Sequence, residues 1–580
     1  MISLYTSLIT ISLLYTTSRL WHLYQNYRIA CCTCLPIIIC PFDPDGMFYA
    51  LFSVPLRPVF QFILPSGIFA TVELSIWGWE FRDKAAIHEK LGPVFIFVTT
   101  GLNRLICADP GMAHHIMAKR RDFVHPEATT QAMGFLGANI VTAKDEAWSR
   151  QRRIVAPALN ERISSEVWRE SVEQASTFAD ILLSSPSSST HENGHTVTGL
   201  RTIAMNVLAR VAYGHRKPFV LHTPIRDTSS SMSYVDAIAV CTELLIAAAF
   251  IPAGLLRLPF MPMSLRILGV ALQRLPGLTR YMLDQERQMS CESRDTNGDA
   301  IAAGQDSSNT IMSTLVHLSD HEKEQADKRS VRESNVGRPY LTEDEIAGNL
   351  FIFTAAGFDT TANTMSYAVA LLATHPQWQT WIQSEIDTVL GAASTSMEPD
   401  YAMAFPMLTR CMAVMLETLR LFPPVTLLMR GTAEPQLIPF EKSPTKSLLL
   451  TTTYSVQVNT MALHTSPSYW GSDALEFKPA RWLQASESGG KEMLITPPRG
   501  RFIPWSMGPR ICPGQKMSQV EFVAVIATLF KKCNAQPMVQ DEENFDEVRQ
   551  RLLELMQDSK PVLTLQLNRP QDVMIRWRER

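Results

Sequence analysis

The sequence has little net charge and no long basic run. Its 580 residues include 53 Lys and Arg against 56 Asp and Glu, which gives a formal net charge of -3 at pH 7. A protein that binds nucleic acid needs a concentrated positive surface to meet the phosphates. The charge balance therefore gives no reason to expect a nucleic-acid partner. Because 46% of the residues are hydrophobic, the chain can instead bury a large core.

Cysteine is sparse and unevenly placed. The 10 Cys residues lack the dense spacing of small secreted proteins that depend on disulfides, so we expect a reducing compartment. Cys31, Cys32, Cys34 and Cys40 form a cluster with one C-x-x-C. No second pair and no nearby downstream His complete a zinc site. Thiols close to a membrane, open to acylation, are therefore favoured over a bound metal.

Charged residues are missing from the first 18 positions. The segment 1–18 is rich in Leu and Ile, and the first charge is Arg19. This pattern predicts a membrane anchor over residues 1–28, with Trp21 and Tyr24 at the interface. A cleaved signal peptide is the alternative, but a basic n-region and a small-x-small cleavage site are both lacking. Because positive charges follow the apolar run, we expect the rest of the chain on the cytosolic side.

Residues 29–80 form a second apolar region that six prolines interrupt. They are Pro36, Pro41, Pro44, Pro55, Pro58 and Pro65. Proline has no backbone N–H to donate, so we predict a hinge with segments on the membrane surface in place of one continuous helix. The remaining residues, 81–580, show no internal repeat and are expected to form one domain.

Two strands are predicted near the start of that domain, and two surface loops are predicted in its middle. Residues 93–99 and 103–107 are apolar and flank a short turn, which is typical of paired strands. The stretches 184–199 and 286–338 are polar, the first rich in Ser and the second in charged residues. Both compositions predict surface loops.

The clearest predicted helix begins at residues 342–345, where Thr-Glu-Asp-Glu can form a capping box, and continues without Pro to His375. At 1.5 Å per residue it would be about 50 Å long. Apolar side chains lie on most of its sides, so we expect it to cross the middle of a large domain. The residues at its centre therefore matter most for function.

That centre reads Ala356-Gly357-Phe358-Asp359-Thr360-Thr361. Glycine inside a helix costs about 1 kcal/mol relative to Ala, so Gly357 indicates a close approach. The Thr360 hydroxyl can bond the carbonyl of Ala356 and open a small groove. The alternative is an ordinary helix kink with a solvated Asp359.

A cysteine stands just before another predicted helix near the C-terminus. Residues 502–515 read FIPWSMGPRICPGQ, and a helical pattern follows from Met517 to Phe530. The helix dipole and the free amides at a helix N-terminus favour the thiolate form of Cys512, the form that binds a metal. Taken alone, Cys512 could also be a buried structural residue in a loop rich in Gly and Pro.

This loop resembles the haem-binding loop of the cytochrome P-450 family, F-x-x-G-x-R-x-C-x-G. The matching residues are Trp505, Gly508, Arg510, Cys512 and Gly514. The resemblance implies that the Cys512 thiolate binds the iron of haem b and that Arg510 pairs with a propionate. Gly508 and Gly514 would let the backbone approach the flat macrocycle. Trp505 stands where the family usually has Phe and would form a flat apolar wall.

The centre of the long helix resembles the family's A-G-x-D-T-T oxygen-activation motif. The resemblance implies that Thr360 and Asp359 are catalytic and deliver protons. It also places four candidate substrate contacts, which are Phe353, Ala356, Val425 and Leu428. These four residues are apolar, so an apolar substrate is expected. Each of the four could equally be an ordinary residue of the hydrophobic core.

Further motifs occur in family order. Trp148 and Arg152 match W-x-x-x-R, and Arg430 stands where the family often has a propionate-binding Arg, so all three are expected to bind the cofactor. Arg150 is instead expected to face solvent or a partner protein. An i, i+4 pair of Trp and Arg is also common on protein surfaces, so the W-x-x-x-R match is persuasive only beside the other motifs.

A charged network is expected to stabilise the fold. Glu417 and Arg420 form an E-x-x-R motif whose i, i+3 spacing puts both on one helical face. Arg481 lies in Phe477-Lys478-Pro479-Ala480-Arg481-Trp482, which resembles F-x-P-E-R-F/W. One carboxylate can accept two planar guanidinium groups, so Arg481 would complete the network. Ala480 replaces the usual Glu.

The resemblance implies a mainly α fold with minor β sheets, the cytochrome P-450 fold, with haem between the long helix and the Cys512 loop. It implies a monooxygenase that uses O2 to hydroxylate, epoxidise or multiply oxidise an apolar small molecule. The chain is most similar to fungal membrane-bound members of secondary metabolism. Two rivals are an oxygen-independent isomerase or dehydratase, disfavoured by intact Asp359 and Thr360, and a non-catalytic haem-binding membrane protein.

The expected partners follow from what is missing. No G-x-G-x-x-G fingerprint follows a strand, and the residues after Cys512 are too few for a fused reductase domain. Electrons are therefore expected from a separate NADPH-cytochrome P-450 reductase, with cytochrome b5 as a second donor. The family resemblance and the predicted anchor together place the chain in the endoplasmic reticulum membrane, with the catalytic domain facing the cytosol.

Overall fold

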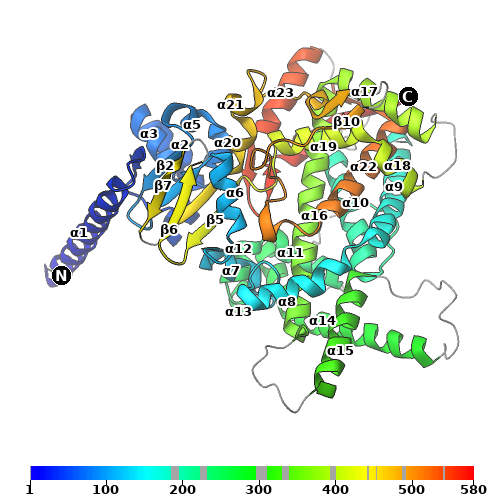
Figure 1. Cartoon of the computed structure of the whole chain (residues 1–580), viewed down its shortest axis with the longest axis horizontal. Helices are drawn as coiled ribbons and strands as arrows, with labels where there is room; N and C mark the ends of the chain where they lie inside the picture. Colours follow the sequence, from blue (N-terminus) through cyan, green and yellow to red (C-terminus); the bar gives the residue numbers. More distant parts are fainter. Residues whose placement is uncertain are drawn as a thin grey trace.

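The computed structural model describes residues 2–184, 195–221, 232–295, 310–329, 339–391, 400–440, 443–451, 454–485, 492–539 and 543–580. In these ranges helices dominate, with one six-stranded sheet and four two-stranded sheets (Figure 1). The six-stranded sheet and helix α1 occupy one side of the molecule, and most of the helices form a body on the other side (Figure 1). This arrangement confirms the expected mainly α fold with minor sheets.

Five helices precede the strand pair predicted at residues 93–107. They are α1 (Ile2–Cys31), α2 (Met47–Ile63), α3 (Ser66–Glu73), α4 (Trp79–Asp83) and α5 (Ala86–Leu91). The region is broken into several elements, as expected, although α2 itself continues through Pro55 and Pro58. Proline removes one hydrogen bond, but its fixed φ near −65° is itself helical, so a peripheral helix can continue through it.

Helix α1 projects from the body of the molecule (Figure 1). None of the helices in the described ranges is, by itself, both long enough and apolar enough to cross a bilayer. Two consecutive helical segments, Tyr401–Met407 and Thr409–Leu421, are together long and apolar enough to cross a bilayer, by length and composition only, and are bent by 60° where they meet.

The six-stranded sheet has the strand order β1-β2-β3-β8-β5-β4. Its strands are β1 (Ile37–Ile39), β2 (Val94–Val98), β3 (Arg104–Cys107), β4 (Phe123–Val124), β5 (Leu427–Thr432) and β8 (Ser455–Asn459). β2 and β3 pair antiparallel, with Val94 opposite Cys107, which confirms the predicted strand pair. β5 pairs antiparallel with β8 and thereby brings residues near 430 to the sheet edge that also holds β4.

The two-stranded sheets are β6–β7, β9–β10, β11–β14 and β12–β13. Their bounds are β6 (Gln436–Phe440), β7 (Ser443–Leu450), β9 (Leu483–Ala485), β10 (Glu492–Leu494), β11 (Cys533–Pro537), β12 (Ser559–Pro561), β13 (Leu565–Leu567) and β14 (Ile575–Glu579). In the β12–β13 hairpin, Ser559 stands opposite Leu567. Leu565 donates its backbone N–H to the carbonyl of Pro424 at 2.8 Å, so this hairpin is tied to the segment that leads into β5.

The helical body is built in chain order. Its helices are α6 (Pro110–Ala118), α7 (Glu127–Gly134), α8 (Asp145–Val155), α9 (Glu161–Ser184), α10 (His195–Tyr213), α11 (Tyr234–Glu243), α12 (Leu245–Phe250), α13 (Ala253–Leu256), α14 (Met263–Asp295), α15 (Ile311–Arg329), α16 (Glu343–Thr374), α17 (Pro376–Leu390), α18 (Tyr401–Ala404), α19 (Thr409–Leu421), α20 (Thr460–Thr465), α21 (Pro467–Trp470), α22 (Gln515–Lys532) and α23 (Phe545–Gln557). Short 3-10 turns are η1 (Ala156–Ala158), η2 (Phe405–Met407), η3 (Pro479–Trp482), η4 (Gly508–Arg510) and η5 (Pro570–Asp572).

Helix α16 is the predicted long helix, and its start is confirmed. The Thr342 side chain accepts from the backbone N–H of Glu345 and the Glu345 carboxylate accepts from that of Thr342, which forms the capping box. α16 packs against α10, α19 and α22, so it lies at the centre of the helical body (Figure 1). Such central burial explains why the helix is apolar on nearly every side.

The two predicted surface loops are only partly loops. Residues 185–194 and 330–338 lie outside the described residues, as do 296–309, but α10 begins at His195 and α15 occupies Ile311–Arg329. α15 buries Ile311, Met312, Leu315 and Val316. These residues repeat at i, i+4 spacing and form a short apolar face. Burial of that face explains why the segment is helical although its average composition is polar.

Candidate active site

Cys512 lies between the η4 turn and the N-terminus of α22. Its backbone N–H donates to the carbonyl of Trp505 at 2.9 Å, which closes the loop on itself. Burial raises the pKa of the Cys512 thiol, while the backbone N–H of Gly514 and the charge of Arg152 act to lower it. The side chain is nevertheless accessible to solvent. Part of Cys512 is therefore exposed to solvent, although protein atoms surround most of its thiol.

Trp505 connects this loop to the helix that follows it. Its indole N–H donates to the Ser518 hydroxyl on α22 at 3.1 Å, and its ring packs against the main hydrophobic core. The Phe that the family usually has at this position could fill the same space but could not donate that hydrogen bond. The Trp is thus compatible with the predicted apolar wall and adds a polar anchor.

The glycines of the loop have different surroundings. Gly508 has φ +71°, and a Cβ there would lie 2.5 Å from the carbonyl oxygen of Met117 at the end of α6. A Cβ on Gly514 would meet only the Cys512 sulfur, at 3.9 Å. Gly508 is therefore required by its backbone conformation and by the contact with α6, in addition to any approach to a macrocycle.

One stripe in the middle of α16 is accessible although most of the helix beyond its first turn is buried. Phe353 and Thr360 are half-buried and Ala356 is exposed, and their spacing puts all three on one helical face. The Thr360 hydroxyl donates to the carbonyl of Ala356 at 2.8 Å, as predicted. α22, which begins three residues after Cys512, packs against α16. The accessible stripe and the thiol thus belong to neighbouring elements.

Four cationic or imidazole side chains converge near the Cys512 loop. Arg152 donates to the carbonyl of Ile511 at 3.2 Å, and Arg430 lies 3.3 Å from His125, measured between Nη1 and Nδ1. Burial lowers the pKa of Arg430 to about 10, with Arg510 as a second cause. Burial, Arg430 and Arg510 lower the pKa of His125 to about 3. Arg430 and Arg510 are therefore close enough to repel one another, and both disfavour a protonated His125.

This set of donors fits the two propionates of haem. In the described part of the chain, Arg152, Arg430 and Arg510 form no ion pair with a carboxylate, although Arg430 is buried. A buried guanidinium without an anionic partner is costly unless a ligand supplies one. His125 was missed by the sequence reasoning, because only the pairing of β4 with β5 brings it next to Arg430.

Arg510 and Trp148 also fix the loop that precedes α8. The Arg510 guanidinium donates to the carbonyls of Ile140, Val141 and Ala143 at 2.7–3.4 Å. Its Cζ lies 5.2 Å from the centroid of the buried Trp148 ring, and Arg120 lies 4.5 Å from the same ring. Arg120 has no signal in the sequence, since a separation of twenty-eight positions from Trp148 follows no spacing rule. Arg510 would keep these structural contacts while it binds a propionate as predicted.

Asp359 points away from the accessible stripe into a polar cluster. Its Oδ1 accepts from Arg201 Nη1 of α10 at 2.9 Å, and its Oδ2 accepts from the hydroxyl of Thr564 at 2.5 Å. Asn363 donates to the same Oδ2 at 3.3 Å. Asp359 is buried, so it is held as a paired carboxylate and is not the solvated Asp of a plain kink. The predicted relay of protons by Asp359 requires one of these contacts to open.

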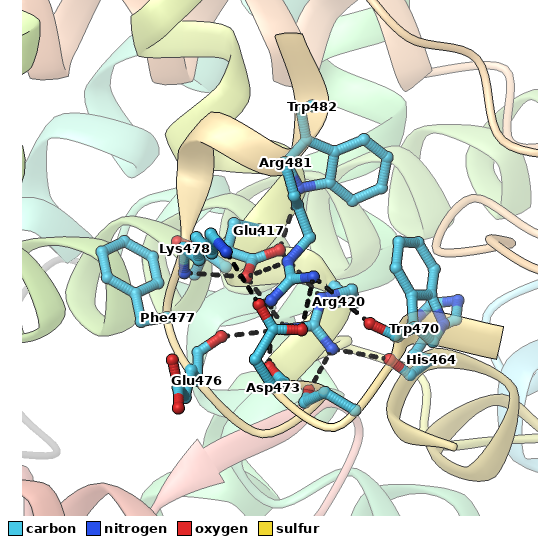
Figure 2. Close-up of polar contacts among 12 residues, drawn as sticks. Glu417, Arg420, His464, Trp470, Asp473, Glu476, Phe477, Lys478, Arg481 and Trp482 are labelled. Atoms are coloured by element: carbon cyan, nitrogen blue, oxygen red, sulfur yellow. Dashed lines mark hydrogen bonds and ion pairs between the residues drawn. The ribbon is translucent and has the colours of Figure 1, made fainter. Parts of the chain in front are cut away.

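The Glu417, Arg420 and Arg481 side chains meet as predicted (Figure 2). Arg420 donates to both carboxylate oxygens of Glu417, at 2.8 and 2.9 Å, and Arg481 Nε donates to Glu417 Oε1 at 2.9 Å. The indole N–H of Trp482 and the backbone N–H of Lys478 complete the shell around the carboxylate, each at 2.9 Å. Glu417 is fully buried, so all of its acceptor capacity is used inside the protein.

Arg420 is bonded as completely as its partner. Besides Glu417, it donates to the backbone carbonyls of His464, Ala474 and Glu476 (Figure 2). Asp473 lies 3.4 Å from Arg481 Nη1 and 3.0 Å from Lys478 Nζ. Asp473 therefore supplies a carboxylate to Arg481 in a chain where Ala480 replaces the usual Glu.

A sequence profile of the cytochrome P-450 family matches residues 76–564. The chain belongs to the cytochrome P-450 family. Members of this family carry haem, so the chain is a haem-dependent monooxygenase, an oxidoreductase that needs O2, a redox partner and an organic substrate. The fold and the cofactor predicted from the sequence are confirmed.

Several relatives of this cytochrome P-450 are fungal. It is 29% identical to the phomenoic acid biosynthesis cluster cytochrome P-450 monooxygenase of Leptosphaeria maculans, over 91% of each chain. It is 28% identical to cytochrome P-450 monooxygenase 124 of Postia placenta, over 86% of this chain and 87% of the relative. A zebrafish cytochrome P-450 solved with abiraterone has the same fold, with a TM-score of 0.59, 16% identity and coverage of 86% and 99%.

The structure corrects the expectation for Arg150. This side chain forms a largely buried ion pair with Glu345 at the first turn of α16, at 2.6 Å, and does not face solvent. Next to it, Gln151 accepts from Asn349, and Asn349 accepts from the backbone N–H of Ile140. Helix α8 and the loop before it are thus clamped onto the start of α16, the helix that carries the predicted catalytic residues.

The four candidate substrate contacts lie in two settings. Ala356 and Val425 are exposed, and Phe353 is half-buried on the accessible stripe of α16. Leu428 is also half-buried, but it packs against the hydrophobic cluster of the six-stranded sheet. Phe353 likewise packs against the main hydrophobic core, so Ala356 and Val425 are the better placed of the four to meet a substrate.

Proposed function

We propose that this cytochrome P-450 uses the Cys512 thiolate as its iron ligand and oxidises an apolar small molecule of fungal secondary metabolism. The observation that carries the proposal is the accessible Cys512 side chain at the start of α22, next to a helix whose accessible stripe contains Thr360. Bound haem would supply the activation of O2, which a thiolate ligand favours by donating electron density to iron.

The residues of the chain would bind and orient that cofactor. Arg152, Arg430 and His125 offer N–H donors to the propionates, and the buried charge of Arg430 would gain an anionic partner. Ala356 and Val425 would give the substrate an apolar wall. The origin of its relatives, one of them from the phomenoic acid biosynthesis cluster, supports a role in secondary metabolism. The reaction would be a hydroxylation, an epoxidation or several successive oxidations.

We also propose that the electrons come from NADPH-cytochrome P-450 reductase, with cytochrome b5 as a second donor. The surface close to the ligand loop supports this assignment. Ile511 and Lys516 flank Cys512 and are exposed, and Arg153 on α8 is exposed as well. Basic side chains around an apolar contact would attract an acidic partner and hold it near the haem.

Replacing Thr360 by Ala should uncouple oxygen consumption from product formation. Its hydroxyl is the polar group on the accessible stripe that can hold a proton donor near the reacting oxygen, and such general-acid contributions are worth about a hundredfold or more. We expect the ratio of product to NADPH consumed to fall at least about tenfold. The measurement is turnover with reductase, NADPH and O2, with peroxide quantified.

Thr361→Ala is the matched control for this test. Thr361 is the next residue, is buried, and donates to the carbonyl of Gly357 at 3.2 Å, so the variant removes a similar hydroxyl from a buried face of the helix. Coupling should stay close to that of the wild type. Equal uncoupling in both variants, or turnover that continues without O2, would contradict the proposed role and favour the oxygen-independent isomerase or dehydratase.

We further propose that the protein resides in the endoplasmic reticulum membrane through its N-terminal segment, with the catalytic domain in the cytosol. α1 exposes Leu13 and Leu14 at 61% and 66%, and α2 exposes Phe62 and Ile63 at 91% and 66%. Water-exposed apolar side chains at this density are typical of a membrane-contacting surface. Both segments lie in the predicted anchor and hinge, residues 1–28 and 29–80.

Introducing charge into α1 should release the protein from membranes. Leu13→Arg with Leu14→Arg would add about 6–8 kcal/mol to the cost of inserting the helix. We expect the membrane-bound fraction to fall at least about tenfold on fractionation of expressing cells. Val220→Arg, at an apolar residue 65% exposed between α10 and α11, is the control and should stay bound. Unchanged membrane binding of the double variant would count against the anchor.

A further inference from the structure

His464 is fully buried in α20, next to the polar network around Glu417 (Figure 2). Its backbone carbonyl accepts from Arg420 Nη1 at 2.9 Å. Its imidazole Nε2 accepts the backbone N–H of Ile503 at 2.9 Å. One residue therefore contacts both the network and the beginning of the loop that carries Cys512.

The ring of His464 makes a second connection to the same loop. Its centroid lies 4.9 Å from that of Phe502, and the Phe502 ring lies 4.5 Å from Trp482. The Trp482 indole donates to Glu417, which is paired with Arg420. The contacts thus form a closed circuit from Glu417 through Arg420, His464, Phe502 and Trp482 back to Glu417.

From Ile503 the hydrogen bonds continue to the thiol loop. The carbonyl of Ile503 accepts the N–H of Ser506 at 3.0 Å, which forms the turn that positions Trp505. The carbonyl of Trp505 in turn accepts the N–H of Cys512. A change in the position of Ile503 would therefore move the backbone that orients the Cys512 sulfur.

The protonation state of His464 suits this role. Nε2 can accept the Ile503 N–H only when it carries no proton. Burial lowers the pKa of His464 to about 3, and the charge of Arg420 lowers it further. The ring is neutral at physiological pH, so Nε2 is available as an acceptor.

We propose that His464 is a positioning residue that transmits the rigidity of the Glu417–Arg420 pair to the loop and holds Cys512 in the geometry of a thiolate ligand. This inference rests on the proposed ligation of iron by Cys512. The network stabilises the fold by itself, and the imidazole connects it to the haem loop. Loss of the acceptor would leave the Ile503 N–H unpaired inside the protein, so the loop would shift to find another partner.

The test compares His464→Leu with His464→Gln in the full-length haem protein. Leu removes the acceptor, whereas the Gln amide oxygen can reach the place of Nε2. The measurement is the absorption band of the reduced protein with carbon monoxide, which distinguishes a thiolate ligand from a neutral thiol. We expect His464→Leu to raise the ratio of thiol-type to thiolate-type band roughly tenfold, which corresponds to about 1.4 kcal/mol. His464→Gln should stay close to the wild type.

His88→Leu controls for the loss of any buried histidine. His88 is 6% exposed, lies in α5 and hydrogen-bonds to Gly92 and Asn459, away from the Cys512 loop. This variant should melt at a lower temperature and keep the thiolate-type band. A wild-type protein without that band would refute the ligation by Cys512, which separates failure of the proposed function from failure of this inference.

A further pair keeps the inference testable if His464→Leu does not fold. The amide oxygen of Asn reaches only the position of Nδ1, so His464→Asn should show the conversion that His464→Gln avoids. A thiolate-type band in the Leu or Asn variant equal to that of the wild type would overturn the proposal. So would equal conversion in the Gln and Asn variants, because the Ile503 acceptor would then make no difference.

Discussion

Cys512→Ala is expected to remove the thiolate-type band of the reduced carbon monoxide complex and to lower turnover by about three orders of magnitude or more. Cys512 lies three residues before α22 begins. Burial raises the pKa of its thiol, whereas the Gly514 amide and Arg152 favour the charged form. A small apolar residue offers the iron no ligand, so the electron density that promotes O–O cleavage would be lost. Spectra of the purified protein and turnover with reductase test this prediction.

Cys533→Ala is the control for this variant. Cys533 is buried at the C-terminal end of the same helix and pairs with β14 through its backbone, so its replacement removes a sulfur without touching the loop. We expect an unchanged band and normal turnover. Pigment and activity that survive in Cys512→Ala would show that another residue binds the iron, and the proposed oxygen chemistry would have to be abandoned.

Arg420→Lys should prevent accumulation of folded haem protein, although it preserves the charge. Arg420 donates to both oxygens of Glu417 and to three backbone carbonyls, and neither side chain has any exposed surface. A lysine ammonium cannot reach that many acceptors, so the buried carboxylate would be left partly unpaired. Breaking a buried pair costs about 3–5 kcal/mol, which is a large part of the 5–15 kcal/mol that usually stabilises a domain.

The measurements for Arg420→Lys are soluble yield, haem content and urea unfolding. Arg569→Lys is the control, because Arg569 pairs with Asp558 at the surface and such pairs contribute about 1 kcal/mol or less. Its stability should be close to that of the wild type. If Arg420→Lys unfolded at the same urea concentration as the control, the network around Glu417 would not be a main support of the fold.

Local patterns predicted the elements that carry the site. The capping box at Thr342 and the uninterrupted apolar run predicted α16, and Gly and Pro around Cys512 predicted a loop before a helix. Both depend on contacts between residues a few positions apart, which a sequence displays directly. The same local reasoning was wrong for residues 311–329, which were predicted to be a surface loop. The segment is polar on average, but four of its apolar residues form a helical face that is stabilised by packing against the core.

The partners of the site residues were not predictable in this way. Asp359 was expected to relay protons, but the pairing with Arg201 and Thr564 joins positions 158 and 205 residues apart. His125 meets Arg430 because β4 pairs with β5, and Arg150 meets Glu345 because α8 lies on α16. None of these pairs shares a spacing that a helix or strand would enforce.

The sequence by itself determined the family, the haem-dependent chemistry and the helix and loop that carry the motifs, because these follow from side-chain types at short, fixed spacings. The tertiary structure decided which charges are paired, which stripe of α16 is accessible, and that His464 connects the buried Glu417 network to the Cys512 loop. Those properties arise from contacts across the chain, whose strength depends on burial and distance, and burial exists only once the protein has folded.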